Sequence, residues 1–194
     1  MVRKNVPLIQ NECYHIYNRA IAGNLLFREE RNYYFFLSKV DKYILPAAEL
    51  LAFCLMPNHY HFILKLKSSD ISNPLQRLAV SYVKSYNLVY NQHGHLFQGP
   101  FQRIHVIDSN YLIHLSRYIH LNPVKADLVE KAESWDFSSY QEYIGLRTPD
   151  IADPLPILNL ISEGSLRSLQ SKQKQYQEFV QEWAFDYMEF KIKK

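Results

Sequence analysis

The sequence is poor in cysteine, in net charge and in long apolar runs. Its two cysteines, Cys13 and Cys54, lie in apolar, strand-like segments, which predicts reduced core thiols and argues against a disulfide framework or a zinc site. The formal net charge of +3 tolerates a polyanionic partner but is far from a histone-like balance. The most apolar stretch, Ile44 to Met56, contains Pro46 and Glu49 and is too short to cross a bilayer.

The composition is otherwise that of a globular protein, with 47% hydrophobic and 21% charged residues. A length of 194 residues is enough for one domain with a real core. The first residues, Met1 to Lys4, lack the apolar run of a signal peptide, so we expect a cytoplasmic protein without a membrane partner. Aromatic residues reach 14%, which supplies a core and leaves rings for stacking on bases.

Hydrophobic periodicity predicts an alternation of strands and helices. The order β-α-β-β-α-β-α is typical of an α+β domain in which helices cover an antiparallel sheet. We expect this domain to span residues 1–147, followed by a Pro-rich linker and a helical tail over 148–194. The predicted strands are Cys13 to Arg19, Glu49 to Met56, His59 to Lys67 and the extended segment Leu96 to Ile107; the predicted helices are Glu29 to Tyr43, Pro74 to Tyr90 and a third, capped by Asp108 or Ser109, that ends before Pro123.

His59 and His61 are the first candidates for chemistry. Residues two apart in a strand point to the same face, about 6–7 Å apart. Two imidazoles so placed can share one divalent metal ion. A histidine pair at this spacing also arises by chance, so a plain core role stays open.

Tyr118 and Asn122 are the second pair of candidates. Four residues apart, they lie on one face of the last turn of the third helix, whose carboxyl end favours a cation. The Asn122 amide oxygen can then supply a hard third ligand beside the phenol of Tyr118. A packing role for Tyr118 and a capping role for Asn122 stay open, because Pro123 disfavours helical geometry at Asn122. His120 is a weak candidate for a base that would help the phenol of Tyr118 to ionise, because it lies two residues away on the helix and points elsewhere.

Several segments in order resemble the single-tyrosine HUH transposases, and more narrowly the REP-associated tyrosine transposases. The similarity covers roughly residues 10–143 and departs from the usual family pattern at Ala20 and Phe97, where Gly and Trp are common. The segments are YHIYNR at Tyr14 to Arg19, LMPNHYHFIL at Leu55 to Leu64, GHLFQGPF at Gly94 to Phe101, RYIHLNPVKADLV at Arg117 to Val129 and WDFSSY at Trp135 to Tyr140.

The resemblance implies a ferredoxin-like or RRM-like sheet, the HUH transposase fold, with His59 and His61 on a central strand. It implies that His59, His61 and Asn122 bind Mg²⁺ or Mn²⁺ and that Tyr118 is the nucleophile. The implied activity is metal-dependent cutting and rejoining of single-stranded DNA through a 5′-phosphotyrosine intermediate. The implied partner is hairpin-containing, REP-like single-stranded DNA, bound by a monomer or a homodimer.

Five basic residues are candidates for contacts with DNA phosphates. Arg19 stands out because it ends a strand beside the predicted centre of the sheet. The others are Arg77, Lys84, Arg103 and Lys125, which are equally compatible with a solvated surface.

Two other functions compete with the transferase. A zinc-dependent hydrolase of small molecules would use His59, His61 and another histidine, and would not need Tyr118. A non-catalytic RRM-like nucleic-acid binder would need neither a metal nor a covalent adduct. The order of residues from Tyr118 to Val124 argues against both, because neither activity calls for a tyrosine and an asparagine one turn apart.

Overall fold

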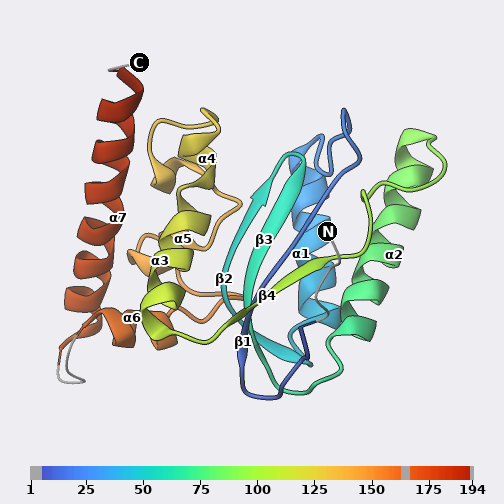
Figure 1. The fold of residues 1–194 in the computed structure, drawn as a ribbon. Coiled ribbons are helices and arrows are strands. Elements are labelled where there is room, and N and C mark those ends of the chain that lie inside the picture. Colours follow the sequence, from blue (N-terminus) through green and yellow to red (C-terminus); the bar gives the residue numbers. More distant parts are fainter. Residues whose placement is uncertain (1–5, 163–166, 193–194) are drawn as a thin grey trace. The chain divides into compact units, whose positions relative to one another are not determined.

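The computed structural model describes residues 6–162 and 167–192, with side chains as far as Glu182 (Figure 1). The chain forms two compact units. The first consists of residues up to Leu50 together with Leu55–Ile107, and the second consists of Leu51–Cys54 and the chain from Asp108 onward. The predicted boundary at residue 148 therefore lies inside the second unit, and the division into a domain and a tail stays a prediction.

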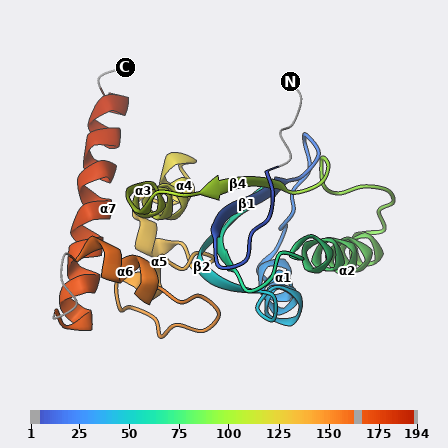
Figure 2. The ribbon, with the colours of Figure 1, turned by 60° about the horizontal axis from the view of Figure 1, so that its bottom comes forward.

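The first unit is built around a four-stranded sheet. Its strands lie in the order β2-β3-β1-β4, and β1 pairs antiparallel with both β3 and β4. The helices α1 and α2 lie together on one face of this sheet (Figure 2), which is the predicted ferredoxin-like arrangement. The elements are β1 (Cys13–Arg19), α1 (Glu30–Tyr43), β2 (Ala48–Met56), β3 (His59–Leu66), α2 (Ser72–Tyr90) and β4 (Gln102–Val106).

Alternation along the strands decides which side chains meet the helices. Phe36 of α1 packs against Tyr60 and Phe62 of β3, with ring centroids 5.2 and 6.2 Å apart. Since neighbouring residues of a strand point to opposite faces, His59 and His61 lie on the face turned away from α1 and α2. Strand pairing places Tyr17 opposite His61 on that same face.

Two predicted elements differ from those observed. The extended segment predicted from Leu96 forms a strand only from Gln102, because Pro100 has no N–H to donate to a ladder and Gly99 weakens a strand. Before it, Phe97 makes one isolated bridge to Ala20. The helix predicted to run up to Pro123 is two helices, because Pro123 sits in the first turn of a new one.

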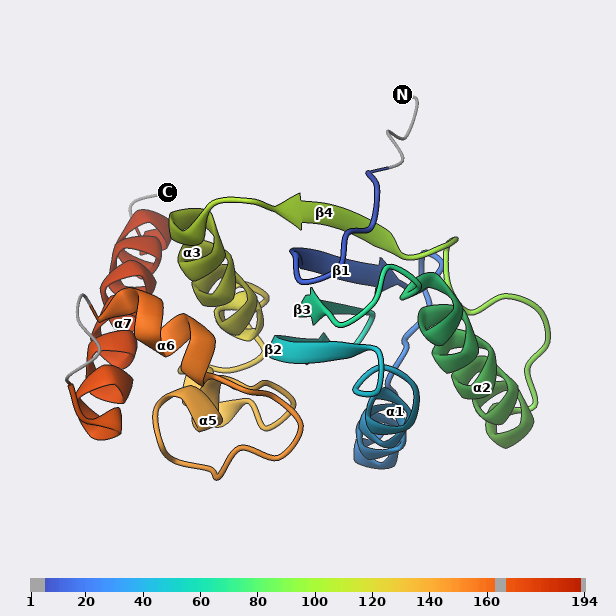
Figure 3. The same cartoon turned by 90° about the horizontal axis from the view of Figure 1, so that it is seen from below.

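The second unit is helical, with α6 packed between α3 and α7 (Figure 3). Asp108 caps α3 as predicted, its side chain accepting a hydrogen bond from the Tyr111 amide at 2.9 Å. The elements are α3 (Ser109–His120), α4 (Asn122–Lys125), η1 (Ala132–Ser134), α5 (Tyr140–Tyr143), α6 (Leu155–Ile161) and α7 (Leu169–Ile192). In the part of the chain that the structure describes, no helix has the length and apolarity needed to span a membrane.

Buried hydrogen bonds hold the centre of this unit together. Tyr176 of α7 is fully buried, and its hydroxyl lies 2.9 Å from Ser116 Oγ and 2.7 Å from His120 Nδ1. The other ring nitrogen of His120 lies 2.9 Å from Ser139 Oγ. The predicted tail is thus part of a packed core beneath α3.

Candidate active site

His59 and His61 lie together at the start of β3. Their ring centroids are 5.0 Å apart and their planes are nearly perpendicular, at 84°. The β-hairpin turn at Pro57-Asn58 explains the position of His59, whose Nδ1 lies 2.6 Å from Asn58 Oδ1. Because an amide oxygen only accepts, Nδ1 of His59 carries the hydrogen and its Nε2 presents a lone pair.

His61 is held by a third histidine that the sequence did not point to. Nδ1 of His61 lies 2.9 Å from Nε2 of His15 in the neighbouring strand, and the two rings stack at 5.1 Å. One of these nitrogens must donate and the other accept. If His61 donates from Nδ1, its Nε2 presents a lone pair, the same tautomer as in His59. Hydrogen bonds of this kind orient histidines that bind metals.

The surroundings keep these rings neutral. Burial, and then the nearby His15 and His59, lower the pKa of His61 to about 2. Burial also lowers the pKa of His15 to about 4. The pKa of His59 is lowered by burial and then by the charge of Arg19. At neutral pH both candidate ligands are thus in the form that binds a metal ion.

These two imidazoles fit a divalent cation as part of a larger ligand set. Among the described residues, no group of three His, Cys, Asp or Glu side chains is arranged to hold a metal ion. A third protein ligand of another type, such as an amide oxygen, is therefore compatible with the pair. Asn122 belongs to the other unit, so its place as that ligand stays a prediction.

Tyr118 lies in the last turn of α3, and Asn122 is the first residue of α4. The side chain of Tyr118 is 43% exposed, which leaves the phenol accessible and rules out a fully packed ring. Asn122 is buried, and its Nδ2 donates to the backbone oxygens of Tyr118 at 2.9 Å and Ile119 at 3.3 Å. Since Nδ2 is fixed on these carbonyls, Oδ1 is the amide atom that faces away from the helix end.

Lys125 lies beside the candidate nucleophile. Its Nζ is 4.3 Å from the centroid of the Tyr118 ring. Burial and then the charge of Arg117 lower the pKa of Lys125 to about 8. A partly desolvated cation thus lies over the ring that would have to ionise.

The other predicted residues have varied surroundings. Arg19 borders a polar cavity at the end of β1. Arg77 stacks on the Tyr43 ring at 5.0 Å, and Lys84 lines a shallow, mostly apolar hollow over α2. Arg103 is half-buried on β4. His120 is fully buried and bound to Tyr176 and Ser139, so it is not available as a base for Tyr118.

Sequence reasoning missed His15 and Tyr17. Both lie on the histidine face of β1, and the Tyr17 ring is 5.8 Å from that of His61. Their two-residue spacing is visible in the sequence, but the register between β1 and β3, which brings them to His61, is not.

Comparison with known proteins adds a match of fold. No family model and no curated protein matches the sequence. A solved structure of a REP-associated tyrosine transposase bound to a REP hairpin does match, with a TM-score of 0.66 and 19% sequence identity. The match covers 79% of this chain and 94% of that one. The chain has the fold of that transposase. The resemblance predicted from the sequence motifs is therefore confirmed at the level of the fold.

Proposed function

We propose that this protein is a metal-dependent single-tyrosine transferase that cuts and rejoins single-stranded DNA, with Tyr118 as the nucleophile. The main support is the pair of neutral imidazoles of His59 and His61, whose ring centroids lie 5.0 Å apart at the start of β3 and whose Nδ1 atoms each make a hydrogen bond. Hydrogen bonds at Nδ1 orient histidines that bind metals, whereas a packing role does not require them.

His59 and His61 would hold the divalent ion, with Asn122 as the third protein ligand. When bound, Mn²⁺ or Mg²⁺ would neutralise charge on the scissile phosphate. Imidazole is a softer donor than the oxygens that Mg²⁺ prefers, so this ligand set favours Mn²⁺.

The chain's own residues account for the covalent step. The Tyr118 oxygen attacks the phosphorus, the phenolic proton is lost to solvent, and the bond from phosphorus to the 3′ oxygen breaks. The products are a 5′-phosphotyrosine and a strand that ends in a 3′-hydroxyl once the leaving oxygen is protonated. Attack by a second 3′-hydroxyl reverses the step, joins DNA to DNA and restores the phenol without ATP.

The proposed substrate is a DNA hairpin with a flanking single strand. The solved transposase of the same fold is bound to a REP hairpin, and this chain shares its arrangement of sheet and helices. Arg19, which pairs with His59 across the strands, supports binding of a phosphate backbone.

The decisive experiment is a search for a covalent protein–DNA adduct. The protein is incubated with hairpin DNA carrying a 5′ single-stranded extension and Mn²⁺, then resolved under denaturing conditions. We expect an adduct that chelator, His61→Ala and Tyr118→Phe each abolish.

Tyr111 provides a matched control for this experiment. It lies on the same helix as Tyr118 and is equally exposed, at 43%. Tyr111→Phe should form the adduct at the wild-type rate. Adduct formation by Tyr118→Phe would refute the proposal. DNA binding without any adduct would favour the RRM-like binder, and metal-dependent hydrolysis that survives Tyr118→Phe would favour the hydrolase.

A further inference from the structure

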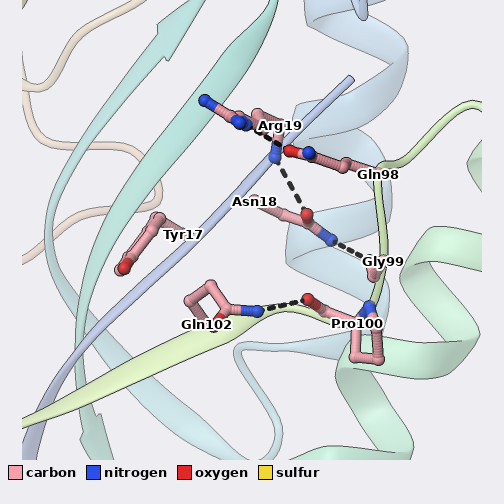
Figure 4. Close-up of a pocket in the computed structure, with 7 residues that line it drawn as sticks. All are labelled: Tyr17, Asn18, Arg19, Gln98, Gly99, Pro100 and Gln102. Atoms are coloured by element: carbon pink, nitrogen blue, oxygen red, sulfur yellow. Dashed lines mark hydrogen bonds between the residues drawn. The ribbon is translucent and has the colours of Figure 1, made fainter. Parts of the chain in front are cut away.

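A polar cavity of about 480 Å³ lies in the first unit at the end of β1. Figure 4 shows its walls, which come from three consecutive residues of β1 and from the segment that leads into β4. The lining residues are Tyr17, Asn18, Arg19, Gln98, Gly99, Pro100 and Gln102. Its volume falls in the range of about 300–1,000 Å³ that is usual for ligand pockets.

Hydrogen bonds fix the walls of this cavity. Asn18 Nδ2 donates to the Gly99 carbonyl at 3.0 Å, and the backbone N–H of Gln98 donates to the backbone carbonyl of Arg19 at 3.0 Å. At one end of the cavity Arg19 Nε donates to Gln98 Oε1, and at the other Gln102 Nε2 donates to the Pro100 carbonyl at 2.9 Å (Figure 4). The cavity is thus preformed, which reduces the entropy that a ligand loses on binding.

The chemistry of the lining selects an anion with a planar, hydrogen-bonding group. Arg19 carries the only charge among the seven lining residues, which argues against a cationic ligand. Gln98 uses its Oε1 to accept from Arg19, so its Nε2 can donate to a ligand. Gln102 uses its Nε2 to donate to Pro100, so its Oε1 can accept from a ligand. Tyr17 is half-buried and offers an aromatic ring. A phosphate, a base edge and a base face each find a partner here.

The position of the cavity ties it to the histidine pair. Tyr17 pairs with His61 across the strands, and Arg19 pairs with His59. The ring of Tyr17, which lines the cavity, lies 5.8 Å from that of His61, so a group bound against Tyr17 lies close to a candidate metal ligand. This distance suits a nucleotide in the same DNA strand as the scissile phosphate.

We propose that this cavity binds a single unpaired nucleotide of the DNA strand, with its base against Tyr17 and its phosphate on Arg19. The identity of the ligand rests on the proposed function. The cavity would fix which phosphate of the flanking single strand reaches the histidine pair, and so would set the position of the cut.

Gly99 offers a way to fill the cavity without disturbing the fold. A Cβ added at Gly99 would meet no protein atom within 4 Å. Valine also favours the extended backbone that a residue before proline adopts. Gly99→Val should therefore narrow the cavity while the protein stays folded. Gln102→Leu, which keeps the size and removes both the Oε1 acceptor and the Nε2 bond to Pro100, is a second variant, and Gln10→Leu on an exposed turn is the control.

The test measures DNA affinity in the presence of chelator, so that no cutting is needed. An abasic site is moved one position at a time along the single-stranded extension of a hairpin oligonucleotide. With wild type and Gln10→Leu we expect one position at which loss of the base weakens binding about tenfold. Gly99→Val and Gln102→Leu should bind the intact DNA as weakly as wild type binds the DNA that is abasic at that position.

Several results would overturn the inference. One is that wild type tolerates an abasic site at every position. Another is that both cavity variants, shown to be folded by their thermal melts, retain the position effect. Displacement of the DNA by micromolar free deoxynucleoside monophosphate would instead make the cavity a site for free nucleotides. Because binding is measured without metal, failure of the adduct experiment with a clear position effect would refute the proposed chemistry and leave the cavity assignment standing.

Discussion

The ammonium group of Lys125 lies over the face of the Tyr118 ring, at 4.3 Å from its centroid. A cation in this position is attracted more strongly by a phenolate than by a phenol. We therefore predict that Lys125→Gln slows formation of the Tyr118 adduct by about five- to tenfold and leaves hairpin binding within about twofold. Single-turnover rates and equilibrium binding measure the two effects separately.

The pH dependence of this effect follows from the pKa of Lys125. Burial and the charge of Arg117 lower it to about 8, so the side chain is charged at pH 7 and neutral well above pH 8. The advantage of wild type over Lys125→Gln should be full at pH 7 and shrink as the pH rises through about 8. Lys125→Arg should keep most of the rate, and Lys131→Gln, at an exposed lysine, should keep all of it. An equal loss of binding and rate would make Lys125 a simple phosphate contact.

Single residues also show how far the sequence can be taken. The spacing of His59 and His61 predicted their shared face, because that follows from the geometry of one strand. The pairing of His15 with His61 could not be predicted, because these residues are 46 positions apart in the sequence. Their contact depends on the register between β1 and β3, which the sequence does not show. The cavity at Arg19 could not be predicted either, because the loop at residues 98–100 forms one of its walls and the sequence does not define the path of that loop.

At the level of elements, α7 contributes to the helix that carries the nucleophile. The Tyr176 hydroxyl bonds both Ser116 and His120 of α3 inside the core. We predict that Tyr176→Phe lowers the free energy of unfolding by about 1–3 kcal/mol, because it leaves a buried imidazole nitrogen without its partner. Urea unfolding measures this loss, with Tyr111→Phe, at an exposed phenol, as the control that should change little. An unchanged midpoint for Tyr176→Phe would contradict this prediction.

The elements themselves were largely predictable up to residue 123, since alternation and helical periodicity report directly on which face is buried. Prediction of the element bounds failed where proline or glycine sets them. The examples are the late start of β4 at Gln102 and the break between α3 and α4. The packing of the tail was also missed. Its Gln- and Lys-rich composition conceals Tyr176 and Val180, which are buried and spaced four apart.

At the scale of the whole molecule, the two units share a strand. Residues Leu51–Cys54 of β2 belong to the helical unit, where the Phe53 amide donates to Ser139 Oγ at 2.9 Å and the Tyr143 hydroxyl donates to the Leu51 carbonyl at 2.8 Å. We predict that a fragment of residues 108–194 does not fold by itself, because it lacks these four residues. Amide dispersion in NMR spectra and thermal melting would test this. A cooperative melt of the fragment would contradict it.

This shared strand has a consequence for how such a protein can be rearranged. A gene fusion moves a continuous run of codons, but the helical unit is assembled from two runs, one of which lies in the middle of the other unit. A continuous run can therefore carry all of the first unit, within residues 1–107, but no run that starts after Cys54 carries all of the helical unit. A rearrangement that moved the candidate nucleophile without β2 would leave the helical unit without Leu51–Cys54.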